Sequence, residues 1–420
     1  MPKAQVRITV LIPTFNRADY LAECLESILN QTVPPWETIV VNDGSTDETR
    51  AVLQPYRSAI EYLETDQVGK PGALNAGLHK VGGDYLWIFD DDDVAFPDAL
   101  ERLVAPLEAH PEHGFSYSTF FYTASRPGSH RIGSTLRESR IPPLAERGFL
   151  LPLLEANFLG GAALFARTAC YESVGDFDPR LLRSQDYEMA IRIARRFTGI
   201  RVPGSPTFHY RQHEGLRGST ADRFEAGRRL HKWLHYDQVI FRDLYRSLAL
   251  EDYLPPGTPL AEHRRQAHLQ RLAILASKLL IPEIATELRC LAQLSDDSPF
   301  SRQERQIVRA TINRVPYYQD GSLDDHVAFF DEVRRLAGSS AVIRRLQREL
   351  LLSLPVRWKM RGNWRHPVQV ARTLSRGLRL YVPGVAGRAA VGRCGQPRVR
   401  GGSTTAPRDT VEAEHTTASR

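Results

Sequence analysis

The sequence predicts an α/β domain with a mainly parallel sheet, followed by an α-helical extension and a disordered tail. Over the first 120 residues, short apolar β-branched runs alternate with amphipathic helical patterns, as in a parallel sheet with helices on both faces. From about residue 221 to 352 the pattern is almost wholly helical. Residues 384–420 are rich in Gly, Arg, Thr and Ala and poor in apolar residues, which is typical of disorder.

The composition is that of a folded protein of two or three domains. The 420 residues are 42% hydrophobic and 25% charged, which excludes wholesale disorder. We place the domain boundaries at 1–220, 221–383 and 384–420.

The sequence also bears on the location of the protein. No apolar run approaches the roughly 18 residues of a membrane span. The four widely spaced cysteines form neither a CxxC motif nor a disulfide framework, so we expect a cytoplasmic location.

The elements of the first domain follow in order along the chain. We expect strands, from their apolar β-branched runs, at 6–12, 38–41, 60–63, 85–89 and 115–119. We expect helices, from their amphipathic periodicity, at 18–29, 46–54, 71–80 and 97–110. A further helix is expected at 185–196, with Ser184 as its N-cap.

Four consecutive aspartates, Asp90, Asp91, Asp92 and Asp93, directly follow the expected buried strand 85–89. Adjacent carboxylates repel one another, and their oxygens are the ligands that Mg²⁺ and Mn²⁺ prefer. In an extended segment Asp90 and Asp92 point to the same side. The run therefore favours a divalent-cation site. A solvated acidic turn that caps the next helix is the alternative.

Two other expected strands also end in polar turns. The first is followed by Pro13-Thr14-Phe15-Asn16-Arg17 and the second by Asn42-Asp43-Gly44-Ser45. Ligands of open parallel sheets bind beyond the carboxyl ends of the strands, so these turns predict a nucleotide pocket beside the aspartates. For Asp43 alone, a simple turn residue is an equally good interpretation.

Taken together, these motifs resemble family 2 glycosyltransferases, which have the GT-A fold. The resemblance covers about residues 6–215 and rests on PTFNR, VVNDGSTDET, GKPGALNAGL, FDDDD and a later GxFDP…QDYE series. It implies an inverting, non-processive transfer of a sugar from a nucleotide-diphosphate sugar to a glycan or lipid-linked acceptor. A UDP-sugar is the expected donor, with dTDP- and GDP-sugars as alternatives. Nucleic acid is not expected as a partner.

The resemblance also implies roles for individual residues. Asp186 would be the catalytic base. Asp92 and His213 would hold Mn²⁺ or Mg²⁺. The donor would be bound by Pro13, Thr14, Phe15, Asn16, Arg17, Asp43, Asp66, Lys70, Asn75, Asp90 and Asp91.

Three departures from the family pattern leave other functions open. The usual Ala-Arg-Asn triplet has Leu74 at its centre, so Lys70 would meet the phosphates instead. The usual Glu-Asp pair is Gln185-Asp186, which keeps a catalytically silent glycan- or membrane-binding scaffold as an alternative. The Gln-x-x-Arg-Trp motif of processive synthases is absent. A sugar-nucleotide nucleotidyltransferase would need a Gly-rich basic loop after the first strand, which Pro13–Arg17 does not provide.

Positive charge is concentrated near the C-terminus. Residues 334–400 hold 16 Lys and Arg against one acid, a net charge of +15, whereas the whole chain carries +6. Amphipathic patterns at 341–354 and 367–380 predict peripheral contact with an anionic membrane through residues 341–381. A solvated face packed on the acidic body and a nucleic-acid patch are the alternatives.

Overall fold

The centre of the sheet is β1 (Ile8–Thr14), flanked by β2 (Glu37–Asn42) and β4 (Tyr85–Ile88). Every residue of β1 is buried, as expected of a strand covered on both faces of a parallel sheet. Both neighbours pair with β1 in parallel. The polar turns after these three strands therefore meet at one edge of the sheet. The computed structural model describes residues 6–204, 206–213, 229–296, 298–313 and 327–361.

The full sheet is mainly parallel, as the sequence predicts. Its seven strands lie in the order β10-β6-β9-β4-β1-β2-β3. Only β9 runs antiparallel to its neighbours β4 and β6 among these strands. The remaining strands are β3 (Glu61–Glu64), β6 (Phe115–Tyr117), β9 (Leu164–Arg167) and β10 (Gly199–Arg201).

Helices pack against this sheet through apolar stripes. On α1 (Ala18–Leu29) the buried residues Leu21, Leu25 and Ile28 follow the helical period. At Gly77 of α3 (Gly69–Leu78) a β carbon would overlap the side chain of Leu11, so glycine lets α3 approach β1 closely. The other helical elements here are α2 (Thr49–Leu53), η1 (Gln54–Tyr56), α4 (Ala99–Ala109), α5 (Leu150–Glu155), η2 (Gly161–Ala163), α6 (Thr168–Val174) and α7 (Gln185–Arg196).

A second sheet of four strands was not predicted. Its order is β5-β11-β7-β8, formed by β5 (Val94–Ala95), β7 (Phe121–Ser125), β8 (Ile132–Glu138) and β11 (Phe208–Gln212). Strand β5 directly follows the four aspartates and pairs with β11. This pairing brings residues distant in sequence to the acidic turn.

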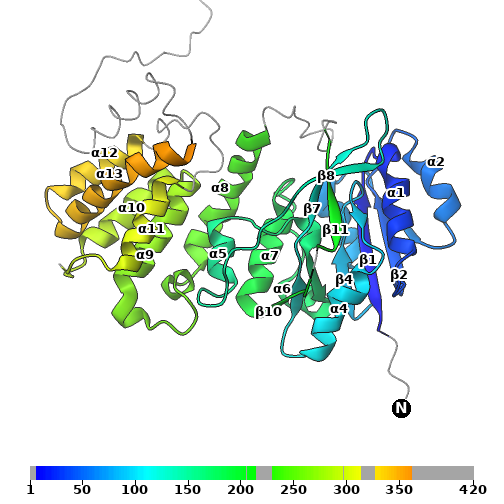
Figure 1. The fold of residues 1–420 in the computed structure, drawn as a ribbon, viewed down its shortest axis with the longest axis horizontal. Coiled ribbons are helices and arrows are strands. Elements are labelled where there is room, and N and C mark those ends of the chain that lie inside the picture. Colours follow the sequence, from blue (N-terminus) through cyan, green and yellow to red (C-terminus); the bar gives the residue numbers. More distant parts are fainter. Residues whose placement is uncertain (1–5, 205, 214–228, 297, 314–326, 362–420) are drawn as a thin grey trace, which may run out of the picture. The chain divides into compact units, whose positions relative to one another are not determined.

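The helical extension is confirmed. Its elements are α8 (Arg229–Ser247), η5 (Leu250–Tyr253), α9 (Leu260–Ser277), α10 (Ile281–Ala292), α11 (Arg302–Asn313), α12 (Val327–Ala337) and α13 (Ala341–Arg361) (Figure 1). Helix α9 is central, because it contacts both α10 and α11 and is buried along most of its length. The boundary expected at 220/221 and the tail expected at 384–420 lie outside the described residues.

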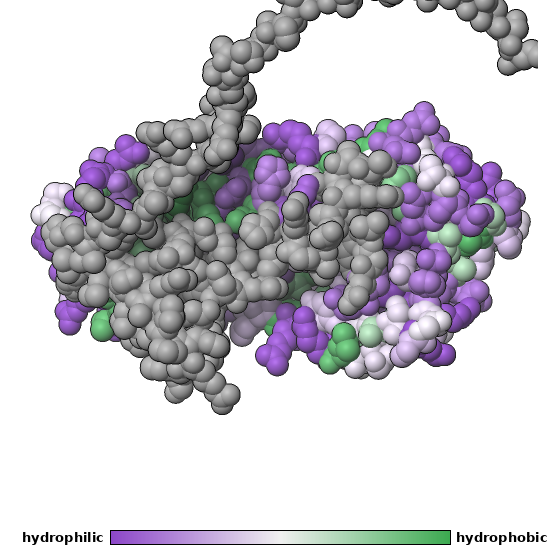
Figure 2. Space-filling view, turned by 90° about the horizontal axis from the view of Figure 1, so that it is seen from above, coloured by the Kyte–Doolittle hydropathy of each residue, from purple (hydrophilic) through white to green (hydrophobic). Residues whose placement is uncertain are grey.

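The apolar face expected to meet a membrane is used inside the fold. Val342, Leu346 and Leu350 of α13 are buried, where α13 contacts α10, α11 and α12. These residues are therefore not available to a lipid surface, and residues 362–381 lie outside the described part of the chain. Among the described helices, none is long and apolar enough to cross a bilayer. The described surface visible from above is mostly hydrophilic (Figure 2).

Candidate active site

A cavity of about 220 Å³ lies where β1, β2 and β4 end. Ten of the residues predicted from sequence line it: Pro13, Thr14, Phe15, Arg17, Asp43, Lys70, Asp90, Asp91, Asp92 and Asp186. They come together because neighbouring parallel strands end at the same edge of the sheet. Asp186 comes from another direction, the first turn of α7. The cavity therefore joins the polar turns to the predicted base.

The acidic turn brings three carboxylates close enough together to hold a cation. Asp90, Asp92 and Asp93 each offer a carboxylate oxygen, and these three oxygens lie within 4.8 Å of one another. One oxygen of the buried Asp93 has no hydrogen-bond partner among the described residues. Burial, with the charges of Asp92 and Asp90, raises the pKa of Asp93 well above its usual range. Hard oxygen donors of this kind fit Mg²⁺ or Mn²⁺.

His213 lies against the same turn. Its Nε2 atom is 2.9 Å from a carboxylate oxygen of Asp92, and its side chain is only 4% exposed. Its Nδ1 atom has no hydrogen-bond partner among the described residues. The structure thus brings together the two residues predicted to hold the metal, although His213 does not line the cavity.

The buried side chain of Arg211 fixes the acidic turn in place. Its backbone N–H donates to Asp93 at 2.9 Å and its Nε donates to the carbonyl of Asp92 at 2.6 Å. Its Nη2 pairs with Glu23 of α1 at 2.7 Å, and its Nη1 donates to the carbonyl of His130. Arg211 therefore connects α1, the hairpin β7–β8 and the acidic turn.

Two cations face the aspartates from the cavity walls. The Lys70 ammonium lies 2.5 Å from Asp90, and the Nε of Arg17 lies 3.7 Å from Asp91. Burial opposes the charged form of Lys70, but Asp90, with Asp186 and Asp91, raises its pKa above the ordinary value. Lys70 therefore stays charged at neutral pH. Burial also raises the pKa of Asp91 to about 7, although the charge of Arg17 opposes the shift.

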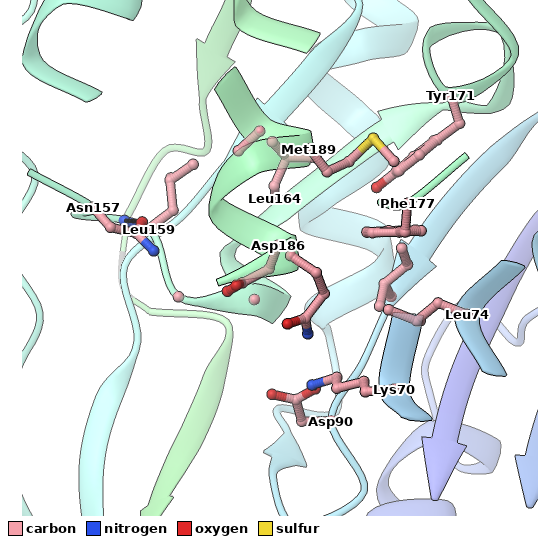
Figure 3. Close-up of a pocket in the computed structure, with 15 residues that line it drawn as sticks. Lys70, Leu74, Asp90, Asn157, Leu159, Leu164, Tyr171, Phe177, Asp186 and Met189 are labelled. Carbon is pink, nitrogen blue, oxygen red and sulfur yellow. Dashed lines mark hydrogen bonds and ion pairs between the residues drawn. The ribbon is translucent and has the colours of Figure 1, made fainter. Parts of the chain in front are cut away.

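Asp186 lines both the main cavity and a smaller, mainly apolar one. Figure 3 shows the smaller cavity, with Asp186 in its wall. The smaller cavity holds about 30 Å³ and includes Leu164, Phe177 and Met189 in its lining. Burial raises the pKa of Asp186, while Lys70 works in the opposite direction. The N-terminus of α7 by itself would lower the pKa of a carboxyl group, and the apolar wall beside Asp186 opposes that effect.

Asp43 is in the cavity wall but is already heavily hydrogen-bonded. Its carboxylate accepts bonds from the Thr65 hydroxyl and from the backbone N–H groups of Val68 and Gly69, each at 2.8 Å. A carboxylate has about four acceptor sites, so roughly one remains for a ligand. Asp43 thus organises the turn that leads into α3.

Three other predicted donor-binding residues do not line the cavity. Asn16, in the left-handed backbone region, accepts the backbone N–H of Thr46 at 2.8 Å. The Asn75 amide donates to the Phe177 carbonyl at 2.9 Å and accepts the Phe177 N–H at 2.8 Å. Asn16 therefore joins the turns after β1 and β2, and Asn75 joins α3 to the loop at Phe177. Asp66 is exposed.

Sequence reasoning missed several cavity residues. Arg183 and Gln185 lie beside Asp186 in the chain, Tyr210 comes from β11, and Trp233 comes from α8 of the helical extension. The Tyr210-Arg211-Gln212-His213 segment held a signal, since it is a polar run on a strand. No sequence signal connected Trp233 to a site about 50 residues upstream of it.

A family model for glycosyl transferase family 2 matches residues 9–173. Residues 9–173 are therefore similar to family 2 glycosyltransferase domains. The match includes the turns after β1, β2 and β4, and ends before Asp186 and the helical extension. The fold class predicted from sequence, GT-A, is thereby confirmed, as is the resemblance on which it rested.

The domain is similar to proteins of several bacteria and to solved structures. An uncharacterised glycosyltransferase of Rickettsia felis is 31% identical over 198 residues, which are 45% of this chain and 31% of that protein. Glycosyltransferase GlyA of Streptococcus pneumoniae serotype 4 is 38% identical over 100 residues, 23% of this chain and 14% of that protein. The chain thus spans about a third or less of these two relatives.

One solved structure covers a larger share of this chain than these two relatives do. S. aureus TarS 1–349 in complex with UDP-GlcNAc is 16% identical, with a TM-score of 0.49, and covers 86% of this chain and 92% of that one.

Proposed function

We propose that the protein transfers a sugar from a UDP-sugar to a hydroxyl group of a glycan or lipid-linked acceptor, with inversion, assisted by Mn²⁺ or Mg²⁺. The match of residues 9–173 to the family model supports nucleotide-sugar transfer. The observation that carries the proposal is that two aspartates of the cation-competent turn, Asp90 and Asp92, and the half-buried Asp186 line one cavity. A transferase needs these two functions on opposite sides of the reacting carbon.

Donor binding would use the strand ends. The nucleotide would lie along Pro13–Phe15 and Asp43, and its diphosphate would meet Lys70 and Arg17. A divalent cation held by Asp92 and Asp93, with His213 beside them, would neutralise the negative charge that develops on the leaving diphosphate. Lys70 and Arg17 supply fixed positive charge for the same purpose. His213 and Arg211 hold the turn in position.

Asp186 would remove the proton from the acceptor hydroxyl as that oxygen attacks the anomeric carbon. A general base works best when its pKa lies closer to the working pH than that of a free aspartate, and the raised pKa of Asp186 has this direction. Attack opposite the leaving diphosphate inverts the anomeric centre in one step. The bond to the acceptor oxygen forms as the bond to the diphosphate breaks.

Thermal denaturation with UDP, GDP and dTDP, each with and without Mn²⁺, tests donor binding. A ligand that binds only the folded state raises Tm by mass action. We expect a Mn²⁺-dependent rise with UDP. No rise with any nucleotide would contradict the proposal and favour a catalytically silent scaffold.

The variant Asp186→Asn tests the chemistry separately. It keeps the side-chain volume but removes the base, so transfer should fall by roughly 10²–10⁴ while the Tm rise with UDP remains. Unchanged transfer would remove Asp186 from the mechanism.

Peripheral membrane contact remains part of the proposal for a lipid-linked acceptor. Its support is the charge of +15 over residues 334–400, since the apolar face of 341–353 is buried. Cosedimentation with anionic vesicles at low salt is the test. Absence of binding there would leave a soluble glycan as the acceptor.

A further inference from the structure

The helical extension contacts the segment that presents Asp186. Helix α8 meets residues 180–187 at three positions. Asp243 pairs with Arg180 at 2.8 Å, the Phe241 ring lies 5.9 Å from the Tyr187 ring, and Asp237 accepts a hydrogen bond from the Ser184 hydroxyl at 3.4 Å. This contact is outside the matched family region, which ends at residue 173.

Ser184 has an unusual backbone. As the residue before α7 it was expected to cap the helix, but its side chain makes no capping hydrogen bond. Its φ of 58° and ψ of 15° are left-handed, a conformation that costs energy for a residue with a β carbon. Such a conformation persists only when the surroundings hold it, and Ser184 lies two residues before Asp186.

Asp237 is itself held by a buried ion pair. Its second carboxylate oxygen lies 2.7 Å from the Nζ of Lys278, and both side chains are 2% exposed. The Lys278 ammonium also lies 4.6 Å from the centre of the Phe241 ring. A buried pair between α8 and the end of α9 thus fixes the carboxylate that meets Ser184.

The same face of α8 reaches the cavity. Trp233 lies four residues before Asp237, so the two share one helix face, and Trp233 lines the cavity together with Ser184 and Asp186. The extension therefore contributes both to the cavity wall and to the support of the segment that carries Asp186.

We propose that α8 completes the active site, with Asp237 as a positioning residue that holds the left-handed backbone of Ser184 and thereby orients Asp186. This inference rests on the proposed function. It implies that a chain shortened to residues 1–220 would lack a properly oriented base.

The test compares Asp237→Asn with Glu304→Gln. Glu304 forms a matched buried ion pair with Arg265 at 2.7 Å, in α11 and α9, and neither residue lines the cavity. With UDP-glucose and UDP-GlcNAc as donors, water as the acceptor and Mn²⁺ present, the assay measures UDP release. We expect kcat to fall at least tenfold for Asp237→Asn, with KM within twofold, and to change less than twofold for Glu304→Gln.

Rescue by glycine distinguishes positioning from general destabilisation. Glycine adopts a φ of 58° without support, so Ser184→Gly combined with Asp237→Asn should recover at least threefold in kcat over Asp237→Asn alone. If Asp237→Asn does not fold, Asp237→Asn/Lys278→Gln removes both buried charges and takes its place.

Equal kcat for the Asp237 and Glu304 variants, or no recovery with glycine, would overturn the inference. Wild-type protein that releases no UDP from either donor would instead contradict the proposed function.

Discussion

The carboxyl groups of Asp186 and Asp90 converge on one point: a β carbon at Gly161 would lie 3.5 Å from an oxygen of each. Asp186 comes from α7 and Asp90 from the turn after β4, 96 positions apart in the chain. The absent side chain of Gly161 leaves room between them, where the reacting groups of donor and acceptor would meet.

Gly161→Ala should therefore reduce transfer without unfolding the protein. A distance of 3.5 Å is ordinary van der Waals contact, so the methyl group fits, but it occupies the space between the two carboxyl groups. We expect kcat to fall by on the order of 10², while the Tm rise with UDP is kept. Gly338→Ala is the control, because a β carbon there has no atom within 4 Å. Equal activity of the two variants would contradict a reaction centre at Gly161.

The pH dependence of transfer should reflect Asp186. A general base acts in its ionised form, and burial raises the pKa of Asp186 while Lys70 lowers it. As the pH is lowered, the transfer rate should therefore begin to fall at a pH above ~3.9, which is the pKa of a free aspartate. Lys70→Met removes the charge that lowers this pKa and should move the acidic limb to still higher pH. A kcat–pH profile gives the pKa of the acidic limb for the wild-type protein and for Lys70→Met. A wild-type pKa at or below that of a free aspartate would contradict the base role.

Removal of the metal or its ligands should abolish nucleotide binding. With EDTA, or in Asp92→Asn and Asp93→Asn, the UDP-dependent rise in Tm should disappear, because the diphosphate would meet uncompensated carboxylates. Glu61→Gln, at an exposed carboxylate on β3, is the control and should keep the full rise. A normal UDP shift in EDTA would show that binding does not need the cation.

Arg211→Met should destabilise the fold far more than Arg7→Met. Arg211 is buried and bonded to Glu23, whereas Arg7 and its partner Asp84 are 46% and 52% exposed. Breaking a buried pair costs about 3–5 kcal/mol, whereas an exposed pair contributes about 0–1 kcal/mol. Urea denaturation gives the two free energies of unfolding. Similar losses for both variants would show that Arg211 does not hold the acidic turn.

Much of the fold was predictable because the apolar periodicity of each segment matches the secondary structure that the segment forms. The helices predicted at 18–29 and 185–196 have those limits in the structure, since their apolar periodicity matches the face that each helix buries. The second sheet was missed because β5 has two residues, and β11 finds its partners only through tertiary contacts.

The sequence by itself determined the chemical character of the site. Aspartates after one strand and polar turns after two others must meet once those strands lie parallel, because their carboxyl ends share an edge of the sheet. Only the tertiary structure decided which side chains face the cavity. Asn16 and Asn75 use their amides on loops, and the carboxylate of Asp43 has three donors. It also decided that Arg211 and α8 support the site, because hydrogen-bond partners far apart in sequence leave no local pattern.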